Sequence, residues 1–309
     1  MEIRVRGGVP VTELIGLLEE KEIEYRVDCP LTSYNTFRIG GIASLAVFPK
    51  TREQLIYALE AVTRSGAKYA VVGKGSNLLF PDGKYQGVVV FTSQVRELSF
   101  EGDRVVASAG VSLSALASRA AREGLAGLEF AAGIPGTVGG AVLMNAGAFG
   151  GEMSQVTLSS EYWNAKTSSC GRFEREEQRF GTRTSVYATR PELTVLSATL
   201  QLQKGEKESI RARMEDYRVR RSATQPLNFP NAGSIFKHPK GFFAGKLIEE
   251  CGLKGTRVGD AEISIKHAGF IVNRGNATAE DVKRLILTVQ ERVMQRYGVS
   301  LECELRFLE

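Results

Sequence analysis

The sequence has no long apolar run, only four cysteines and only two histidines, and these absences exclude several kinds of protein. No apolar run approaches the roughly 18 residues that a membrane-spanning helix needs, and no charged-then-apolar leader follows Met1. The cysteines (Cys29, Cys170, Cys251 and Cys303) have neither metal-binding nor redox spacing. We therefore expect a cytoplasmic protein with reduced thiols, no bound metal and no membrane association.

The charge balance excludes a further class of partner. The 40 Lys and Arg residues exceed the 35 Asp and Glu residues by only five, and the two signs are interleaved. A nucleic-acid-binding surface needs clustered basic residues with aromatic partners. We therefore expect no nucleic-acid partner, and anionic small molecules fit the mild positive charge better.

Helical and strand-like segments follow one another irregularly along the 309 residues. Capping residues and terminal glycines predict helices over 51–66, 112–124 and 278–298. Strand-like runs lie at 69–72, 88–92, 104–109, 193–203, 268–273 and 300–308. This mixture lacks the even alternation of a doubly wound sheet, so it indicates an α+β fold. A polar break at 204–207 predicts two domains, 1–204 and 205–309.

Two glycine-rich segments are the most unusual feature of the sequence. They read VVGKGSNLLF (71–80) and AAGIPGTVGGAVLMNAGAFGG (131–151), and glycine and alanine fill more than half of the second. Glycine inside regular structure costs up to about 1 kcal/mol relative to alanine, so tight turns, tight backbone packing or a closely approaching ligand must compensate. Neither segment has the Rossmann dinucleotide fingerprint. The first could form a nest of main-chain N–H groups around a diphosphate, completed by Ser76 and Asn77.

Six segments, taken in order, resemble the UDP-N-acetylenolpyruvoylglucosamine reductase family. They are NTFRIGG (35–41), VVGKGSNLLF (71–80), GIPGTVGGAVLMNAGAFGGEM (133–153), AGSIFKHP (232–239), AGKLIEECGLKG (244–255) and KHAGFIVN (266–273). The resemblance implies a two-lobed FAD-binding domain of the vanillyl-alcohol-oxidase type, followed by a smaller α+β substrate-binding domain. It implies an FAD-containing oxidoreductase that uses NADPH to reduce UDP-N-acetylglucosamine enolpyruvate during peptidoglycan synthesis.

The resemblance also implies which residues contact the cofactor. It places noncovalent FAD against Arg38, Gly73, Lys74, Gly75, Ser76, Asn77, Leu78, Gly133, Ile134, Pro135, Gly136, Val138, Gly139, Gly140, Asn145, Ala146, Gly147 and Ala148. Many oxidases of this fold tether flavin through histidine or cysteine. The two histidines, His238 and His267, lie in the C-terminal half, and the glycine-rich segments contain neither residue type.

Three residues match the catalytic positions of the family. Arg183 would hold the substrate carboxylate, because a guanidinium stays charged while negative charge develops. Ser234 would donate a proton to carbon, with Lys237 stabilising the alkoxide that remains. Glu304, chosen over Glu302, would hold the carboxyl end of the substrate or assist proton transfer. From the residues alone, each position has an ordinary structural explanation. Arg183 would form a surface ion pair, Ser234 would bond its own backbone in a turn, and Glu304 would lie on a solvated strand face.

The same resemblance implies contacts to the substrate. The implied substrate-binding residues are Arg220, Arg221, Lys237 and His238. A solvated helix face is the ordinary explanation of the arginine-rich segment 211–226. The family commonly has tyrosine at the position of Thr182 and asparagine at that of His238. Thr182 puts the usual affinity for substrate or NADPH in doubt, whereas a histidine at position 238 can still donate and accept hydrogen bonds. We expect a monomer.

Two other functions stay open at this point. One is a flavin-dependent sugar or alcohol oxidase of the same fold. The other is a catalytically silent UDP-sugar-binding protein, which only Thr182 suggests. The joint presence of Arg183, Ser234 and Glu304 argues against a silent protein.

Overall fold

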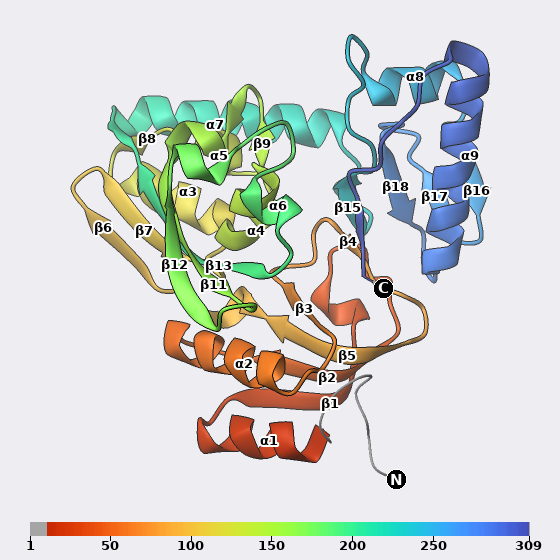
Figure 1. Ribbon diagram of the computed structural model, residues 1–309. Helices are drawn as coiled ribbons and strands as arrows, with labels where there is room; N and C mark the ends of the chain where they lie inside the picture. The colour runs from red at the N-terminus through yellow and green to blue at the C-terminus, as the bar shows by residue number, and fades with distance from the viewer. Residues whose placement is uncertain (1–10, 309) are drawn as a thin grey trace. The chain divides into compact units, whose positions relative to one another are not determined.

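The computed structural model describes residues 11–308, which fall into two compact units (Figure 1). Unit 1 comprises the chain up to residue 28, 44–74 and 86–219, and unit 2 comprises 29–43, 75–85 and the chain from 220 onwards. This division differs from the predicted domains 1–204 and 205–309. The reason is packing, because Phe37, Ile39 and Leu79 are buried in the core of unit 2.

The first part of unit 1 is a four-stranded sheet covered by two helices. Its strands run in the order β1 (Glu24–Pro30), β2 (Ile42–Phe48), β5 (Lys84–Phe91) and β3 (Tyr69–Val72). The helices are α1 (Val11–Glu20) and α2 (Arg52–Arg64). Alternate residues of a strand share one face of a sheet. Leu45 and Val47 of β2 accordingly lie in one core with Leu14 of α1 and Leu55 of α2.

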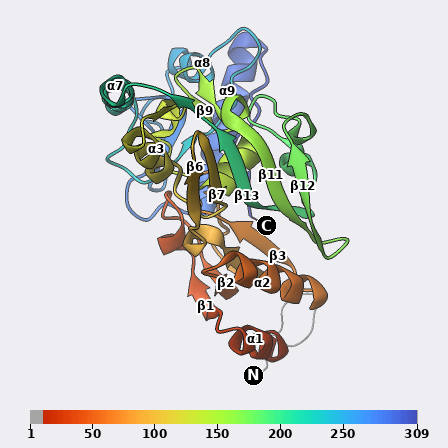
Figure 2. The ribbon, with the colours of Figure 1, turned by 90° about the vertical axis from the view of Figure 1, so that its left-hand side faces the viewer.

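The second part of unit 1 is a five-stranded antiparallel sheet, whose strands lie side by side in Figure 2. Its order is β12 (Ser169–Glu174), β11 (Thr157–Asn164), β13 (Leu193–Gln201), β7 (Arg104–Ser108) and β6 (Leu98–Glu101). Helices α3 (Leu113–Arg122) and α4 (Val138–Met144) share its core. The shorter strands are β8 (Leu125–Ala126), β9 (Gly147–Ala148), β10 (Gly151–Glu152) and β14 (Gln203–Lys204). The remaining helices are α5 (Met153–Val156), α6 (Val186–Thr189) and the long α7 (Lys207–Thr224).

Unit 2 is a four-stranded sheet with helices on its core side. The strand order is β15 (Asn231–Ser234), β18 (Phe270–Asn273), β17 (Ala261–Ile263) and β16 (Arg257–Val258). Its helices are α8 (Ala244–Glu250) and α9 (Ala279–Tyr297). Ile263 and Ile271 pack with Val282 and Leu285 of α9. The short strands β4 (Leu78–Leu79) and β19 (Arg306–Phe307) pair in parallel.

Locally coded elements match their predictions. The Thr278 hydroxyl accepts the N–H of Asp281 in a complete capping box, and Gly298 ends α9 with φ +65°. Ser112 precedes α3, as predicted, but its hydroxyl makes no capping hydrogen bond. All four cysteines are free thiols, as predicted.

The predicted strand over 300–308 is wrong for most of its length. Only Arg306–Phe307 forms a strand, and Cys303 makes an isolated bridge to Phe236. The N–H groups of Glu304 and Leu305 both donate to the carbonyl of Ile235, at 2.7 and 3.4 Å. Two consecutive donors on one acceptor cannot belong to a regular ladder, so the chain bends at this point.

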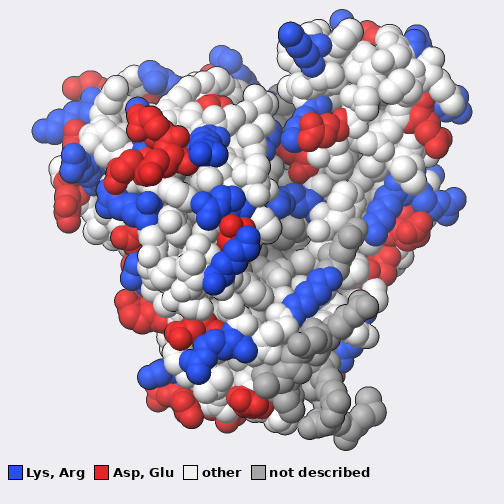
Figure 3. Space-filling view, in the orientation of Figure 1, with Lys and Arg blue, Asp and Glu red and all other residues white. Residues whose placement is uncertain are grey.

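The surface carries mixed charge. Lys and Arg side chains are interspersed with Asp and Glu side chains on the face shown in Figure 3. Within residues 11–308, none of the helices combines the length and the apolar composition needed to cross a membrane.

Candidate active site

Four residues of unit 1 form the first part of the site. Strand β3 leads into Gly73 and Lys74, and the Lys74 ammonium donates to the Ser112 hydroxyl at 3.0 Å. Ser112 forms an isolated β-bridge with Thr137, which precedes α4. The Ser112 hydroxyl, which the sequence predicts to cap α3, is therefore bonded to Lys74 instead. Sequence reasoning missed Thr137, although it is the one hydroxyl-bearing residue in 131–151.

This part of the site fits an extended ligand with acceptor atoms, as FAD is. The Thr137 hydroxyl is buried and has no hydrogen-bond partner among the described residues. A Cβ on Gly73 would clash with that hydroxyl. A Cβ on Gly140 would instead have Thr137 Oγ1, at 3.7 Å, as its nearest atom among residues 11–308, so their packing does not require glycine there. A buried donor without a partner and a bare, open α-carbon are both expected where a cofactor lies.

Other glycines of the same segment pack against protein. A Cβ on Gly139 would lie 2.9 Å from the Cβ of Ala109, and one on Gly147 would lie 2.6 Å from the carbonyl of Gly151. The N–H groups of Val138 and Gly139 already donate to the carbonyls of Val111 and Ala109, each at 2.9 Å. Cofactor contact by Val138 or Gly139 stays a prediction, but their N–H groups are not free to join a nest.

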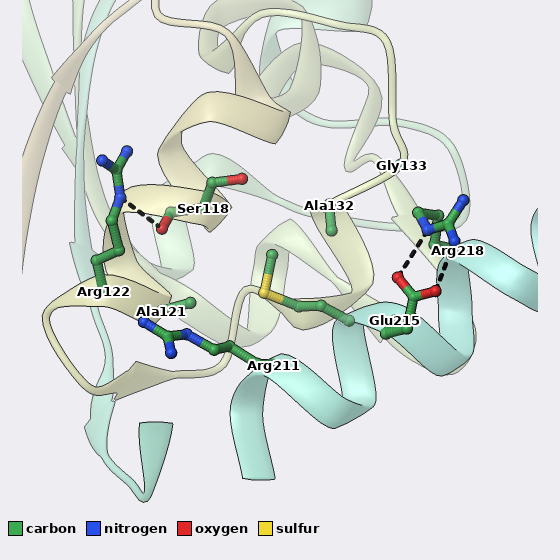
Figure 4. Close-up of a pocket in the computed structure, with 9 residues that line it drawn as sticks. Ser118, Ala121, Arg122, Ala132, Gly133, Arg211, Glu215 and Arg218 are labelled. Atoms are coloured by element: carbon green, nitrogen blue, oxygen red, sulfur yellow. Dashed lines mark hydrogen bonds and ion pairs between the residues drawn. The ribbon is translucent and has the colours of Figure 1, made fainter. Parts of the chain in front are cut away.

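Gly133, which begins the segment 133–136 that leads into α4, lines a groove of about 440 Å³ in unit 1. Figure 4 shows this groove between α3 and α7, with Gly133 at its edge. Arg211 extends from α7 toward Ala121, Arg122 is bonded to the carbonyl of Ser118, and Arg218 is bonded to Glu215 by two hydrogen bonds. The cofactor contacts predicted for Gly133, Ile134, Pro135, Gly136, Ala146 and Ala148 stay predictions.

Arg183 also belongs to unit 1. It lies in a tight turn closed by an antiparallel bridge between Gly181 and Thr184, and its φ is +54°. Its guanidinium donates to the carbonyl of Gly147 at 3.0 Å. Asn145 is 1% exposed, and its amide nitrogen donates to the carbonyl of Gly181 at 3.0 Å. The side chain and the main-chain N–H of Asn145 are therefore both bonded within the protein, and its cofactor contact stays a prediction.

In unit 2, the residues after Lys74 meet the C-terminal segment. Gly75 has φ +59°, and a Cβ there would lie 2.7 Å from the carbonyl of Tyr34. The amide of Asn77 donates to the carbonyl of Glu304 at 3.1 Å, and Leu78 pairs with Arg306. Asn77 thus positions the main chain of a predicted catalytic residue. Cofactor contacts of Arg38, Gly75, Ser76, Asn77 and Leu78 stay predictions.

Ser234 and Glu304 lie side by side in unit 2. Ser234 ends β15, and the next residue, Ile235, accepts the Glu304 N–H at 2.7 Å. The Ser234 hydroxyl has no hydrogen-bond partner within residues 11–308 and is partly exposed, so it is available to a substrate. His267 was missed as a site residue. Its ring and Ser234 Oγ both lie within 3.3 Å of the point where a Cβ on Gly269 would sit.

The two histidines have defined hydrogen bonds. His267 Nδ1 accepts the N–H of Gly269 at 3.1 Å, and burial lowers the pKa of His267, with a smaller effect of nearby Lys254. His238 Nδ1 accepts the N–H of Ala244, the first residue of α8, at 3.3 Å. In both rings Nε2 is left as the donor. His238 therefore caps α8, while its substrate contact stays a prediction.

The predicted cations of unit 2 differ in their partners. The Lys237 ammonium is bonded to the exposed carboxylate of Glu302. Arg221 is half-buried, burial lowers its pKa, and among the described residues its guanidinium has no hydrogen bond or ion pair. A partly desolvated cation without a counter-ion is suited to an anionic ligand. Arg220 is exposed, and its substrate contact stays a prediction.

Comparison with known proteins connects both units to one family. Residues 225–308 match the family described as UDP-N-acetylenolpyruvoylglucosamine reductase, C-terminal domain, and residues 43–167 match an FAD binding domain. The UDP-N-acetylenolpyruvoylglucosamine reductase of Clostridium novyi is 42% identical over 296 residues, which cover 96% of this chain and 95% of that protein. The enzyme of the same name from Caldicellulosiruptor saccharolyticus is 44% identical over 293 residues, 94% of each chain.

A solved structure agrees with these sequence relatives. The crystal structure of UDP-N-acetylenolpyruvylglucosamine reductase from Thermus caldophilus superposes with a TM-score of 0.77 at 36% identity, covering 93% of this chain and 99% of that chain. The predicted α+β fold and the predicted FAD-binding domain are confirmed. This chain therefore belongs to the UDP-N-acetylenolpyruvoylglucosamine reductase family and is an FAD-containing oxidoreductase.

Proposed function

We propose that this chain reduces UDP-N-acetylglucosamine enolpyruvate to UDP-N-acetylmuramate with NADPH, as a step of peptidoglycan precursor synthesis. The observation that carries the proposal is the placement of Ser234 beside Glu304, with a serine hydroxyl that has no hydrogen-bond partner within residues 11–308. A solvated turn or strand face would not require these two predicted catalytic residues to meet. Their meeting is expected if both act on one substrate.

The residues of unit 1 would hold the cofactor. Lys74 and the buried hydroxyl of Thr137 would face acceptor oxygens of FAD, and the α-carbon of Gly140 would lie against it. When bound, FAD supplies the two-electron transfer between NADPH and the substrate. The chain itself supplies binding, orientation and proton transfer.

Arginines of each unit would hold the negative groups of the substrate. In unit 2, Arg221 would pair with a phosphate, because its half-buried guanidinium has no protein partner within residues 11–308. In unit 1, Arg183 would hold the carboxylate of the enolpyruvyl group. A planar guanidinium binds a carboxylate with two hydrogen bonds and stabilises the charge that develops on it.

Ser234 would give its hydroxyl proton to the substrate carbon. Serine is a weak acid, so the transfer depends on a strongly basic acceptor and on neighbouring positive charge. The sequence suggested Lys237 for that charge, but its ammonium is bonded to Glu302. Glu304 would orient the carboxyl end of the substrate, with its main chain fixed by Asn77 and Ile235.

Separate measurement of the two half-reactions tests this proposal. Ser234→Ala should bind FAD and be bleached by NADPH at the wild-type rate. Reoxidation by UDP-N-acetylglucosamine enolpyruvate without oxygen should slow by about 10²–10⁴-fold, the usual contribution of general acid catalysis. Thr288→Ala, which removes a hydroxyl from the exposed side of α9, is the matched control and should leave both rates unchanged.

Three outcomes would contradict the proposal. Slow bleaching of Ser234→Ala by NADPH would mean that the serine positions the cofactor. Unimpaired reoxidation would remove the proton-donor role. Failure of the wild-type enzyme to be reoxidised by this substrate, with rapid reoxidation by oxygen, would instead indicate an oxidase.

A further inference from the structure

The turn that carries Arg183 is short and has a strained backbone. It spans only Gly181 to Thr184, joined by main-chain hydrogen bonds of 3.0 and 3.2 Å. Arg183 has φ +54°, and a left-handed backbone costs a residue with a side chain about 1–2 kcal/mol. Thr182, at the tip, is exposed and adds no core packing. Contacts from outside the turn, among them the hydrogen bond from the neighbouring Ser185 hydroxyl to the carbonyl of Leu143 at 2.8 Å, therefore help to fix its position.

Asn145 provides one of these contacts from a rigid position. It follows α4 as a left-handed cap with φ +43°, a conformation that asparagine tolerates better than most residues. Its Nδ2 donates to the carbonyl of Gly181 at 3.0 Å, and its Oδ1 accepts the N–H of Ser154 at 2.9 Å. The side chain thus joins the end of α4, the start of α5 and the Arg183 turn.

The main chain beside Asn145 provides the second contact. Two residues along, the carbonyl of Gly147 accepts the Arg183 guanidinium at 3.0 Å. The N–H of Ala146 donates to Ala141 at 2.8 Å, and the N–H of Met153 donates to Ala146 at 3.0 Å. The segment that receives the guanidinium is therefore bonded to α4 and to α5 through the main chain of Ala146, the residue that follows Asn145.

We propose that Asn145 is a positioning residue that sets the orientation of Arg183 toward the substrate carboxylate. This inference rests on the proposed function, in which Arg183 holds that carboxylate. Asn145 is buried and both polar atoms of its amide are bonded within the protein, so it acts through the arginine turn. Displacement of a catalytic group by about 1 Å can slow a reaction about 100-fold.

Asn145→Asp is the sharpest variant, because it keeps the shape of the side chain. One carboxylate oxygen still accepts the Ser154 N–H, while the other faces the Gly181 carbonyl without a proton to donate. Protonation of the carboxyl at low pH restores a donor at that position. Asn145→Gly is the second variant, since glycine adopts the left-handed cap without strain and removes both side-chain hydrogen bonds.

Ser65→Ala is the matched control in unit 1. Ser65 is also buried, donates to a carbonyl (Val62, 2.7 Å) and accepts a main-chain N–H (Ala67, 3.3 Å), but it lies at the end of α2. The control should lose stability without any change in substrate binding. Each variant is made with Arg183 and with Arg183→Lys, so that a double-mutant cycle reports the coupling.

We expect both Asn145 variants to keep FAD and to be reduced by NADPH at the wild-type rate. Reoxidation by the enolpyruvyl substrate should slow about 10- to 100-fold, and the calorimetric Kd of the substrate should rise. The ratio of Asn145→Asp to wild-type reoxidation should recover as the pH is lowered. In the Arg183→Lys background the same variants should add no further loss.

Equal losses in the two Arg183 backgrounds would overturn the inference, as would loss of FAD from both Asn145 variants. An effect of Ser65→Ala on substrate affinity would also overturn it. If Arg183→Lys alone changes neither substrate affinity nor reoxidation, the proposed role of Arg183 fails. If Arg183→Lys is impaired and the Asn145 variants are not, only the positioning role fails.

Discussion

Gly139 and Gly140 are adjacent in α4, but we expect glycine to be needed at the two positions for different reasons. A Cβ on Gly139 would lie 2.9 Å from the Cβ of Ala109, whereas the described atom nearest to a Cβ on Gly140 would be Thr137 Oγ1, at 3.7 Å. Protein packing therefore excludes a side chain from Gly139 alone. If bare backbone at Gly140 serves FAD, Gly140→Val should weaken FAD binding without harming the fold.

The size of each effect follows from these distances. Forcing a side chain into a filled space costs about 1–3 kcal/mol. At Gly140 that cost falls on the complex with FAD, which means about 5- to 150-fold weaker binding. The apoprotein should not be destabilised, because replacing a helical glycine gains up to about 1 kcal/mol. Gly139→Ala should instead lower the free energy of unfolding by the same amount, about 1–3 kcal/mol, because the backbone of α4 must move away from Ala109.

Two measurements separate the variants. Titration of apoprotein with FAD gives the Kd, and urea unfolding of the apoprotein gives the free energy of unfolding. Gly140→Val should lose affinity and keep its stability, while Gly139→Ala should lose stability. Wild-type FAD affinity in Gly140→Val would refute the reasoning, because the cofactor could not then lie against that α-carbon.

Two further predictions concern Thr182 and His267. Thr182→Tyr should leave the FAD content unchanged and alter KM for NADPH or for the enolpyruvyl substrate, since Thr182 is exposed next to Arg183; identical steady-state constants would show that the aromatic side chain common in the family is dispensable here. Burial lowers the pKa of His267 below its ordinary value of 6.5, so the unfolded chain binds this proton at a higher pH than the folded protein. The contribution of His267 to stability should therefore be complete above about pH 6.5 and decrease as the pH falls below it, as measured by urea unfolding. In His267→Gln the free energy of unfolding should decrease less at low pH. An equal decrease in the variant and the wild type would contradict the lowered pKa of His267.

The sequence predicted those features whose determinants lie within a few residues. The capping box of Thr278 with Asp281 spans one helical turn, and Gly298 ends the same helix. The reduced cysteines and the α+β class likewise follow from local spacing and pattern. The match of six segments to a family then supplied the cofactor and the reaction.

Features that depend on distant residues could not be predicted in this way. Ser112 has the sequence pattern of a helix cap, but Lys74, 38 positions earlier, takes its hydroxyl. The alternation in 300–308 is typical of a strand, but Ile235 accepts two consecutive N–H groups from that segment. The sequence did not identify His267 as a site residue because Ser234 is distant from it in the sequence. The two side chains come together in the fold, on either side of the point where a Cβ on Gly269 would sit. In each case, a residue distant in the sequence determines the structure that the local segment adopts.

Backbone strain shows a further property that composition cannot reveal. Arg38, Asn145 and Arg183, all predicted site residues, have positive φ without being glycine. A left-handed backbone costs a residue with a side chain about 1–2 kcal/mol, a cost that favourable side-chain contacts offset. For Asn145 the contribution is visible as two buried hydrogen bonds, and for Arg183 as a guanidinium held against Gly147. The glycine-rich segment thus has glycine at position 140, where we expect a side chain to obstruct the cofactor. At Asn145, and at Arg183 in the bonded turn, a side chain is needed and the backbone is strained. This combination is expected of a site that binds a large cofactor and also orients a catalytic group.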